Sequence, residues 1–246
     1  MKCDAVVEKA WQWKGCEKID VLEGTALEKW GKELGFGLWL FRRKIPVRHV
    51  HVWAAQCAEM FSGHGRAMKV GKRVGAYDTI QATIRNCTCK YDYPGVAAHQ
   101  VVHLPNPRCG VLTNMLNYMH GSLDVGSGDN VEFNEVLANQ YKVFDQDISY
   151  HTDANDLLDK NPTIISISLG ATGAFCYAPD GGTKFGQQWC HNETKTGTKL
   201  TAVRESQRNA GVKGIVPLGA GDILVMWGEF PTVFSSQDVT KLHGEE

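Results

Sequence analysis

The sequence lacks a clear excess of charge of either sign. Its 246 residues include 26 Lys and Arg against 27 Asp and Glu, which gives a formal net charge of −1 at pH 7. Proteins that coat nucleic acid or lie on membrane surfaces usually carry a strong basic excess. The charge balance therefore argues against both classes, although it leaves room for a local basic patch.

The sequence also lacks a secretory signal and any apolar run long enough to cross a membrane. Charged residues interrupt the segment from Met1 to Lys9, where a signal peptide needs a continuous apolar stretch. We therefore expect an intracellular protein, located in the nucleus or the cytoplasm. In that setting the eight cysteines are expected as reduced thiols, many of them packed as small hydrophobic side chains.

A well-spaced zinc motif is absent as well. Cys87, Cys89, Cys190 and His191 could be imagined as four ligands, but the first two are too close together for the usual zinc knuckle. The pair His49-Val-His51 has no third ligand at a suitable spacing, so partly buried structural histidines are the better interpretation. Neither group predicts a metal site.

The hydrophobic content, 43% of the residues, is enough for the core of one domain with an N-terminal addition. The glycines of Ser62–Gly65 indicate a connector, so we predict an accessory segment over residues 1–62 and a main domain over 63–246. The accessory segment is expected to pack on the sheet of the main domain.

Several helices and strands are expected from local signals. Thr25 and Glu28 form a capping box that predicts a helix from Ala26 to Leu34, ended by Gly35. A second helix is expected from Gly110 to Met119, ended by Gly121, because apolar residues recur there at helical spacing. β-Like patterns predict strands over 37–41, 131–141, 148–151, 163–172 and 223–227, and short β-like pieces that alternate with turns over 67–84. A polar insertion is expected over 183–213.

The segment His151-Thr152-Asp153 carries the first chemical signal. On an extended strand the side chains of His151 and Asp153 project to the same side. They would supply two of the three ligands of the facial triad that binds ferrous iron and leaves positions open. A short surface segment can show this spacing by chance, so the pair needs its context.

That context resembles the AlkB-like iron(II)/2-oxoglutarate dioxygenases. The matching strings lie in order over roughly residues 70–236: Tyr91–Gly95, Phe133-Asn134, Leu137–Lys142, His151–Asp153, Ser166–Ala171 and Gly221–Met226. The resemblance implies an α+β, mainly β fold, with a double-stranded β-helix (jelly roll) core and N-terminal helices packed on the sheet.

The same resemblance implies the cofactors and their ligands. Iron(II) would be held by His151 and Asp153, and 2-oxoglutarate would accept hydrogen bonds from Asn139 and Tyr141. The family's second histidine should follow the Gly221-Asp222 strand, at the position of Ser235 or Ser236 here. Neither serine is a good iron ligand, so His243 is the candidate third ligand.

Two tyrosines are candidates for substrate binding. Tyr91 and Tyr93 precede a Pro-Gly pair, where the family has a nucleotide-recognition lid, and an aromatic ring there could stack on a flipped base. Packing beneath a loop is the alternative. Nearby, the basic residues Arg66, Lys69, Lys72 and Arg73 could line the substrate entrance or form a solvated loop.

The family's arginine for the distal carboxylate of 2-oxoglutarate is missing. It belongs on a further strand, whereas only Gly244-Glu-Glu246 follows His243. We therefore expect this sequence to be a C-terminally incomplete version of an AlkB-like enzyme, lacking the last strand.

The predicted function is oxidative demethylation of N-alkylated bases in DNA or RNA, by a monomer. The missing arginine favours one alternative, a catalytically incomplete module that binds nucleic acid. The near-neutral charge permits another, a 2-oxoglutarate hydroxylase acting on a substrate other than nucleic acid, since phosphate contacts normally require Lys and Arg.

Overall fold

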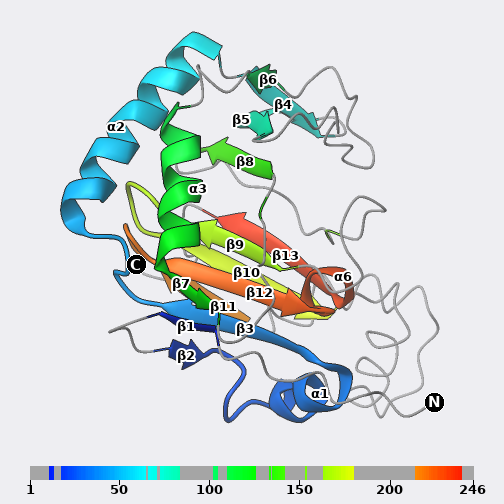
Figure 1. The fold of residues 1–246 in the computed structure, drawn as a ribbon. Helices are drawn as coiled ribbons and strands as arrows, with labels where there is room; N and C mark the ends of the chain where they lie inside the picture. Colours follow the sequence, from blue (N-terminus) through cyan, green and yellow to red (C-terminus); the bar gives the residue numbers. More distant parts are fainter. Residues whose placement is uncertain are drawn as a thin grey trace, which may run out of the picture.

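The computed structural model describes residues 11–13, 18–64, 66–70, 73–83, 102–104, 110–125, 133, 135–141, 153, 163–179 and 214–239. They form helices and mainly antiparallel sheets, with two long helices standing against the strands (Figure 1). This mixed architecture agrees with the expected α+β class. No helix in the described part of the chain is long and apolar enough to cross a membrane.

The first helix, α1 (Ala26–Leu34), begins and ends where the sequence predicts. The Thr25 hydroxyl accepts a hydrogen bond from the N–H of Leu27 at 3.2 Å and donates one to the Leu22 carbonyl at 2.6 Å. Glu28 accepts from the N–H of Gly24 rather than from that of the cap residue. Gly35 ends the helix in the left-handed conformation, with φ 73°.

A four-stranded antiparallel sheet, here the main sheet, lies at the centre of the molecule. Its strand order is β2-β3-β12-β9. The strands are β2 (Lys18–Asp20), β3 (Phe36–Phe41), β12 (Ile223–Gly228) and β9 (Ile164–Ile167). Strand β3 pairs with β12 over its whole length. The segment expected to be accessory therefore contributes an internal strand, in addition to covering the sheet.

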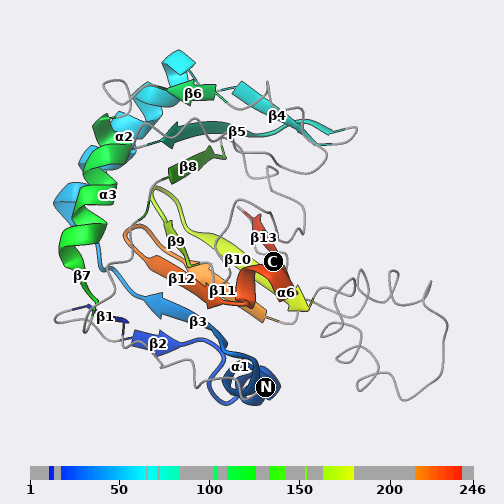
Figure 2. The same cartoon turned by 45° about the vertical axis from the view of Figure 1, so that its right-hand side comes forward.

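A second sheet of three antiparallel strands packs against one face of the main sheet (Figure 2). Its order is β11-β10-β13, and a short helix, α6, connects β12 to β13. The bounds are β10 (Gly173–Pro179), β11 (Gly214–Leu218), α6 (Phe230–Val233) and β13 (Phe234–Val239). Two packed antiparallel sheets are compatible with the expected jelly roll.

A third group of strands extends beyond the main sheet. Strand β5 pairs antiparallel with β4 and β8 and parallel with β6. The bounds are β4 (Arg66–Val70), β5 (Arg73–Thr83), β6 (Val102–Leu104) and β8 (Glu135–Gln140). A separate two-stranded pair joins β1 (Trp11–Trp13) to β7 (Leu123–Val125).

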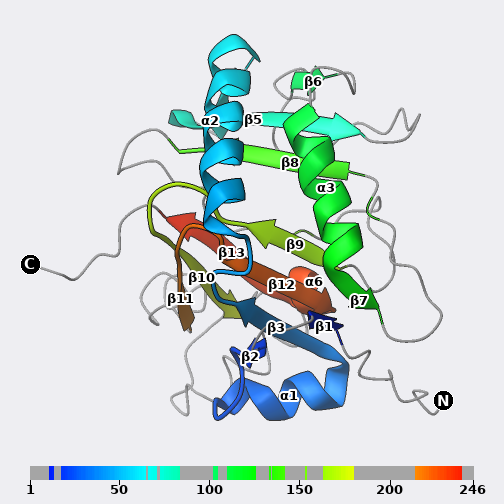
Figure 3. The ribbon, with the colours of Figure 1, turned by 60° about the vertical axis from the view of Figure 1, so that its left-hand side comes forward.

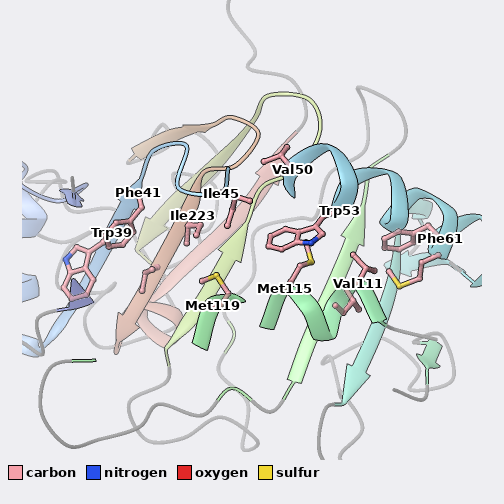
Figure 4. Packing of buried hydrophobic residues seen from close by; sticks show 13 residues of the cluster. Trp39, Phe41, Ile45, Val50, Trp53, Phe61, Val111, Met115, Met119 and Ile223 are labelled. Carbon is pink, nitrogen blue, oxygen red and sulfur yellow. The ribbon is translucent and has the colours of Figure 1, made fainter. Parts of the chain in front are cut away.

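Two helices cover the other face of the main sheet and of β8 (Figure 3). They are α2 (Val47–His64) and α3 (Gly110–Ser122). Their inner faces form a core with alternate residues of the strands, including Trp39 and Phe41 of β3 and Ile223 and Val225 of β12 (Figure 4). Full burial of each such side chain contributes roughly 1.5–3 kcal/mol to the stability of the fold.

The intervening residues of the same strands form a second core between the two sheets. Leu38 and Leu40 of β3 and Leu224 of β12 meet Phe175 and Val216 of the second sheet. Phe230 and Phe234 lie in this core with their rings stacked, the centroids 4.5 Å apart. The strict alternation shows that the main sheet is covered on both faces.

Two glycine-based boundaries differ from expectation. Ser62, Gly63 and His64 form the last turn of α2, and Gly121 lies inside α3 instead of ending it. In α2 the neighbouring Met60 and Phe61 are buried in the core. Their packing holds the last turn helical despite the low helix propensity of glycine, because tertiary contacts outweigh propensity.

Candidate functional site

Strand β8 sets the direction of the Asn139 side chain. Val136 and Ala138 pack against the core beneath α2 and α3. Because side chains alternate along a strand, Leu137 and Asn139 project to the opposite face. On β3 and β12 that face meets the second sheet. Asn139 therefore points away from the helices, on the same side of the strand layer as the second sheet.

Tyr141 directly follows β8, whose last residue is Gln140. Its side chain and that of Asn139 are both half-buried. The pairing of β8 with β5 places Asn139 opposite Thr79, so the backbone there is fixed by a regular antiparallel ladder. A strand end held in this way provides a rigid support for polar side chains.

Asp153 is held by the connection between β12 and β13. Its backbone N–H donates a hydrogen bond to the carbonyl of Pro231 in α6, with an N–O distance of 2.9 Å. Pro231 itself is buried, and it lies between Phe230 and Phe234, which are 0% and 1% exposed. The half-buried Asp153 is thus attached to the margin of the core between the two sheets.

The structure describes only part of the predicted site. His151, His243, Tyr91 and Tyr93 lie outside the described residues, as do Lys72 and the segment 183–213. Asn139, Tyr141 and Asp153 are described, and each makes a side-chain or backbone interaction. The two serines that occupy the expected histidine position lie on β13, where Ser235 is opposite Ala178 and Ser236 is opposite Tyr177 of β10.

Asp153 suits a ferrous ion, because a half-buried carboxylate is a hard oxygen donor. No group of three His, Cys, Asp or Glu residues is placed to hold a metal within the part of the chain that the structure describes. Of the predicted iron ligands, the structure therefore describes only Asp153, and the two predicted histidines lie outside the described residues.

The His49-x-His51 pair does not form a chelating site. Both residues belong to α2, where positions two apart face different sides of the helix. The ring of His49 stacks on Trp53 at 5.4 Å between centroids and meets the edge of Tyr118 at 5.6 Å. His51 is exposed. This arrangement agrees with the prediction that these histidines have a structural role and do not bind a metal.

The carboxylate of Asp222 organises the end of the main sheet opposite α6. It accepts hydrogen bonds from the N–H of Arg43 at 2.7 Å, the N–H of Gly219 at 2.9 Å and the guanidinium of Arg42 at 2.7 Å. Its carbonyl accepts from the N–H of Ser168, just after β9. Sequence reasoning used Gly221-Asp222 only as part of a resemblance. The Gly-Asp pair directly before a strand could have indicated that Asp222 accepts hydrogen bonds at the turn.

Burial raises the pKa values of two described side chains. Burial raises the pKa of the Cys57 thiol to about 11. Burial also raises the pKa of Tyr177, with a smaller contribution from the negative charge of Asp20. Burial therefore favours the protonated, neutral form of both side chains.

Comparisons with known proteins place this arrangement in a family. Residues 37–242, most of the chain, match the family model of the 2OG-Fe(II) oxygenase superfamily. Among solved structures, that of OsALKBH1 is similar, with 17% identity and a TM-score of 0.46, and the match covers 82% of this chain and 84% of that one. No curated protein matches. From the extent of the family match, the chain belongs to the 2OG-Fe(II) oxygenase superfamily.

Proposed function

We propose that this chain is an AlkB-like dioxygenase that uses iron(II) and 2-oxoglutarate to demethylate N-alkylated bases of DNA or RNA. The observation that carries the proposal is the placement of Asn139 and Asp153. Asn139 projects from β8 to the side of the strand layer that carries the second sheet, and Asp153 is attached to α6 at the margin of the core on that side. Both residues belong to the strings that resemble the AlkB-like enzymes.

In this proposal His151 and Asp153 hold the metal, with His243 as the third ligand. Asn139 and Tyr141 donate hydrogen bonds to 2-oxoglutarate. If bound there, iron(II) and 2-oxoglutarate would supply the oxidative removal of an N-methyl group by dioxygen, with formaldehyde, succinate and carbon dioxide as products. The protein contributes the position of each ligand.

The backbone hydrogen bond of Asp153 has a specific part in this arrangement. Phe230 and Phe234 fix α6 in the core, and α6 fixes the backbone of Asp153 through the Pro231 carbonyl. A carboxylate with a fixed backbone loses less conformational freedom on binding a ligand than one on a mobile loop. Tyr91 and Tyr93 would stack on the substrate base, an interaction that contributes roughly 1–3 kcal/mol per base.

The test is the release of succinate from 2-oxoglutarate in the presence of ferrous iron and ascorbate. It is run with and without an oligonucleotide that carries 1-methyladenine or 3-methylcytosine, and formaldehyde is measured in parallel. His151→Ala and Asp153→Ala should abolish both products. His51→Ala is the matched control, because His51 is an exposed histidine of α2 outside the proposed site.

Three outcomes separate the alternatives. Succinate that increases with the methylated oligonucleotide, together with formaldehyde, supports demethylation. Succinate that does not respond to the oligonucleotide points to a hydroxylase with another substrate. If a folded protein binds the oligonucleotide but releases no succinate, the proposed enzymatic activity is contradicted and a noncatalytic binding module is favoured. A His243→Ala variant of an active protein then tests the third ligand.

A further inference from the structure

A cluster of cations lies where β3 turns into α2. It consists of Arg42, Arg43, Lys44 and Arg48, here called the β3–α2 basic patch. The side chain of Arg42 is 45% exposed, and Arg43 and Arg48 are exposed as well. In Figure 3 the end of β3 runs directly into the lower end of α2.

Hydrogen bonds hold this turn in one place. Arg42 and Arg43 both bind the Asp222 carboxylate, and Arg42 also donates to the carbonyl of Pro217 at 2.6 Å. The N–H of Ile45 donates to the carbonyl of Gly221 at 3.0 Å. The four cations are therefore presented from a fixed backbone.

Acidic side chains are scarce in the described surroundings of the patch. The chain contains no Asp or Glu from Leu34 to Ala58. The described segments that meet the turn, residues 168–172 and 214–221, contain none either. Asp222 is the exception: it is 2% exposed, and its carboxylate forms an ion pair with the guanidinium of Arg42. A chain with a formal charge of −1 thus has a locally cationic surface here.

The backbone of Arg43 is a second, independent observation. Its φ is 45°, and it is the one non-glycine residue with positive φ in the described part of the chain. Glycine or asparagine would adopt this conformation at a lower cost in free energy. The Arg43 side chain makes no ion pair with any described residue. The hydrogen bond from the Arg43 N–H to Asp222 holds the backbone in this conformation, and the side chain remains exposed.

The beginning of α2 adds to the same field. Its first turn contains no acidic residue and carries Arg48. The N-terminal end of a helix has a partial positive charge, and its free N–H groups attract anions. For α2, an 18-residue helix, this charge adds to the positive charge of the arginines instead of being neutralised.

We propose that the β3–α2 basic patch binds the phosphate backbone of a nucleic acid. Arg43 and Arg48 are exposed arginines, whose planar guanidinium groups match phosphate oxygens in pairs. A membrane surface fits less well, because the exposed apolar residues nearby are Val47 and Val52. Membrane-surface helices usually insert Trp, Phe or Leu.

This inference deepens the proposed function, because it assigns part of the nucleic-acid contact to a surface away from Asp153. The patch adjoins the start of β12, whereas Pro231 follows the end of that strand. Six residues of strand span roughly 20 Å. A substrate that reaches both places must therefore span about 20 Å, which corresponds to about six nucleotides of a stacked strand at ~3.4 Å per nucleotide.

The experiment measures binding of a fluorescent 20-nucleotide single strand to the full chain by anisotropy, from 25 to 200 mM salt. The variant Arg43→Gln/Arg48→Gln removes two cations of the patch. The matched control, Lys29→Gln/Lys32→Gln, removes two exposed cations of α1. Urea unfolding of each protein checks that it remains folded.

The expected result is at least a tenfold loss of affinity at low salt for the patch variant alone. The slope of log K against log salt should become shallower by about 1.4, because each phosphate contact contributes ~0.7. Equal effects of the two variants, or no binding by the unchanged protein, would overturn the proposal. So would loss of binding to vesicles containing phosphatidylserine without loss of binding to the oligonucleotide.

Failure of this inference is distinguishable from failure of the proposed function. Binding is measured without turnover, and succinate can be measured with a methylated trinucleotide too short to reach the patch. If the chain binds through the patch but releases no succinate, only the proposed enzymatic activity is contradicted. A chain that is active but binds equally well without Arg43 and Arg48 contradicts only the patch.

Discussion

The guanidinium of Arg42 lies 2.7 Å from the carboxylate of Asp222, and this ion pair joins the end of β3 to the start of β12. The two partners have different surroundings, since the Asp222 side chain is 2% exposed and that of Arg42 is 45% exposed. A buried carboxylate requires partners, and the N–H groups of Arg43 and Gly219 complete its set. Asp222 therefore depends on the pair more than Arg42 does.

Asp222→Asn should lower the free energy of unfolding by roughly 2–4 kcal/mol. The amide replaces one acceptor oxygen with an NH2 group that faces donors. Urea unfolding followed by circular dichroism measures the change. Arg42→Gln should cost less, because the arginine is half-exposed and the backbone donors to Asp222 remain. An equal or larger loss for Arg42→Gln would contradict this account.

Thr25→Ala should destabilise the protein by about 1 kcal/mol, since it removes the cap of α1. The lost hydrogen bonds are those from the Leu27 N–H and to the Leu22 carbonyl. Thr25→Ser keeps the hydroxyl and should remain close to the unchanged protein. The midpoint of thermal unfolding distinguishes the two variants, and equal losses would show that the methyl group matters instead.

Gly228→Ala should be more harmful than Gly24→Ala, although both glycines have positive φ, at 63° and 71°. At Gly24 a Cβ atom would meet nothing within 4 Å, so only backbone strain of about 1 kcal/mol is expected. At Gly228 it would collide with the carbonyl of Gly35, which is backbone and cannot turn aside. We expect an additional loss of at least ~1 kcal/mol, measured by urea unfolding.

The pKa of Cys57 predicts a loss of stability in alkaline solution. The thiol has an ordinary pKa of 9.0 in the unfolded chain and one of about 11 in the folded protein. Its contribution is present in full below pH 9. As the pH rises from 9 through 11, the unfolded chain releases the proton first, so stability falls. Cys57→Ala should show a shallower fall between pH 8.5 and 10.5 in urea unfolding, and parallel curves would refute the prediction.

Local signals predicted the elements whose boundaries depend on nearby residues. The helix at Ala26–Leu34 and the strand ending at Phe41 are confirmed, because the cap of Thr25 and the left-handed Gly35 act within one or two turns. The strand at Ile223 is confirmed as well, because the turn residues Gly219–Asp222 directly precede it. Such signals need no knowledge of the rest of the chain.

Helix α2 shows what local signals missed. No helix is among the elements expected between Pro46 and Gly65, although the buried residues Val50, Trp53, Met60 and Phe61 recur at helical spacing. The core beneath the helix, not propensity, stabilises it. Periodicity over the whole segment was the signal that could have found it.

Long-range relationships of the site could not be predicted from the sequence. The resemblance selected Asn139 and Asp153, and the strand pattern allowed two faces for Asn139. Packing of Val136 and Ala138 beneath the helices decides which face it uses. The hydrogen bond between Asp153 and Pro231 involves backbone atoms alone, so no pattern of side chains in the sequence predicts it.

The position of β3 in the main sheet has a consequence for synthesis of the chain on the ribosome. Arg42 and Asp222 are 180 residues apart, and the neighbouring strands β3 and β12 are paired along their whole length. The apolar strand Phe36–Phe41 therefore emerges long before its main partner and waits with an open edge, a state that favours aggregation. We therefore expect folding to be slow and limited by this late pairing.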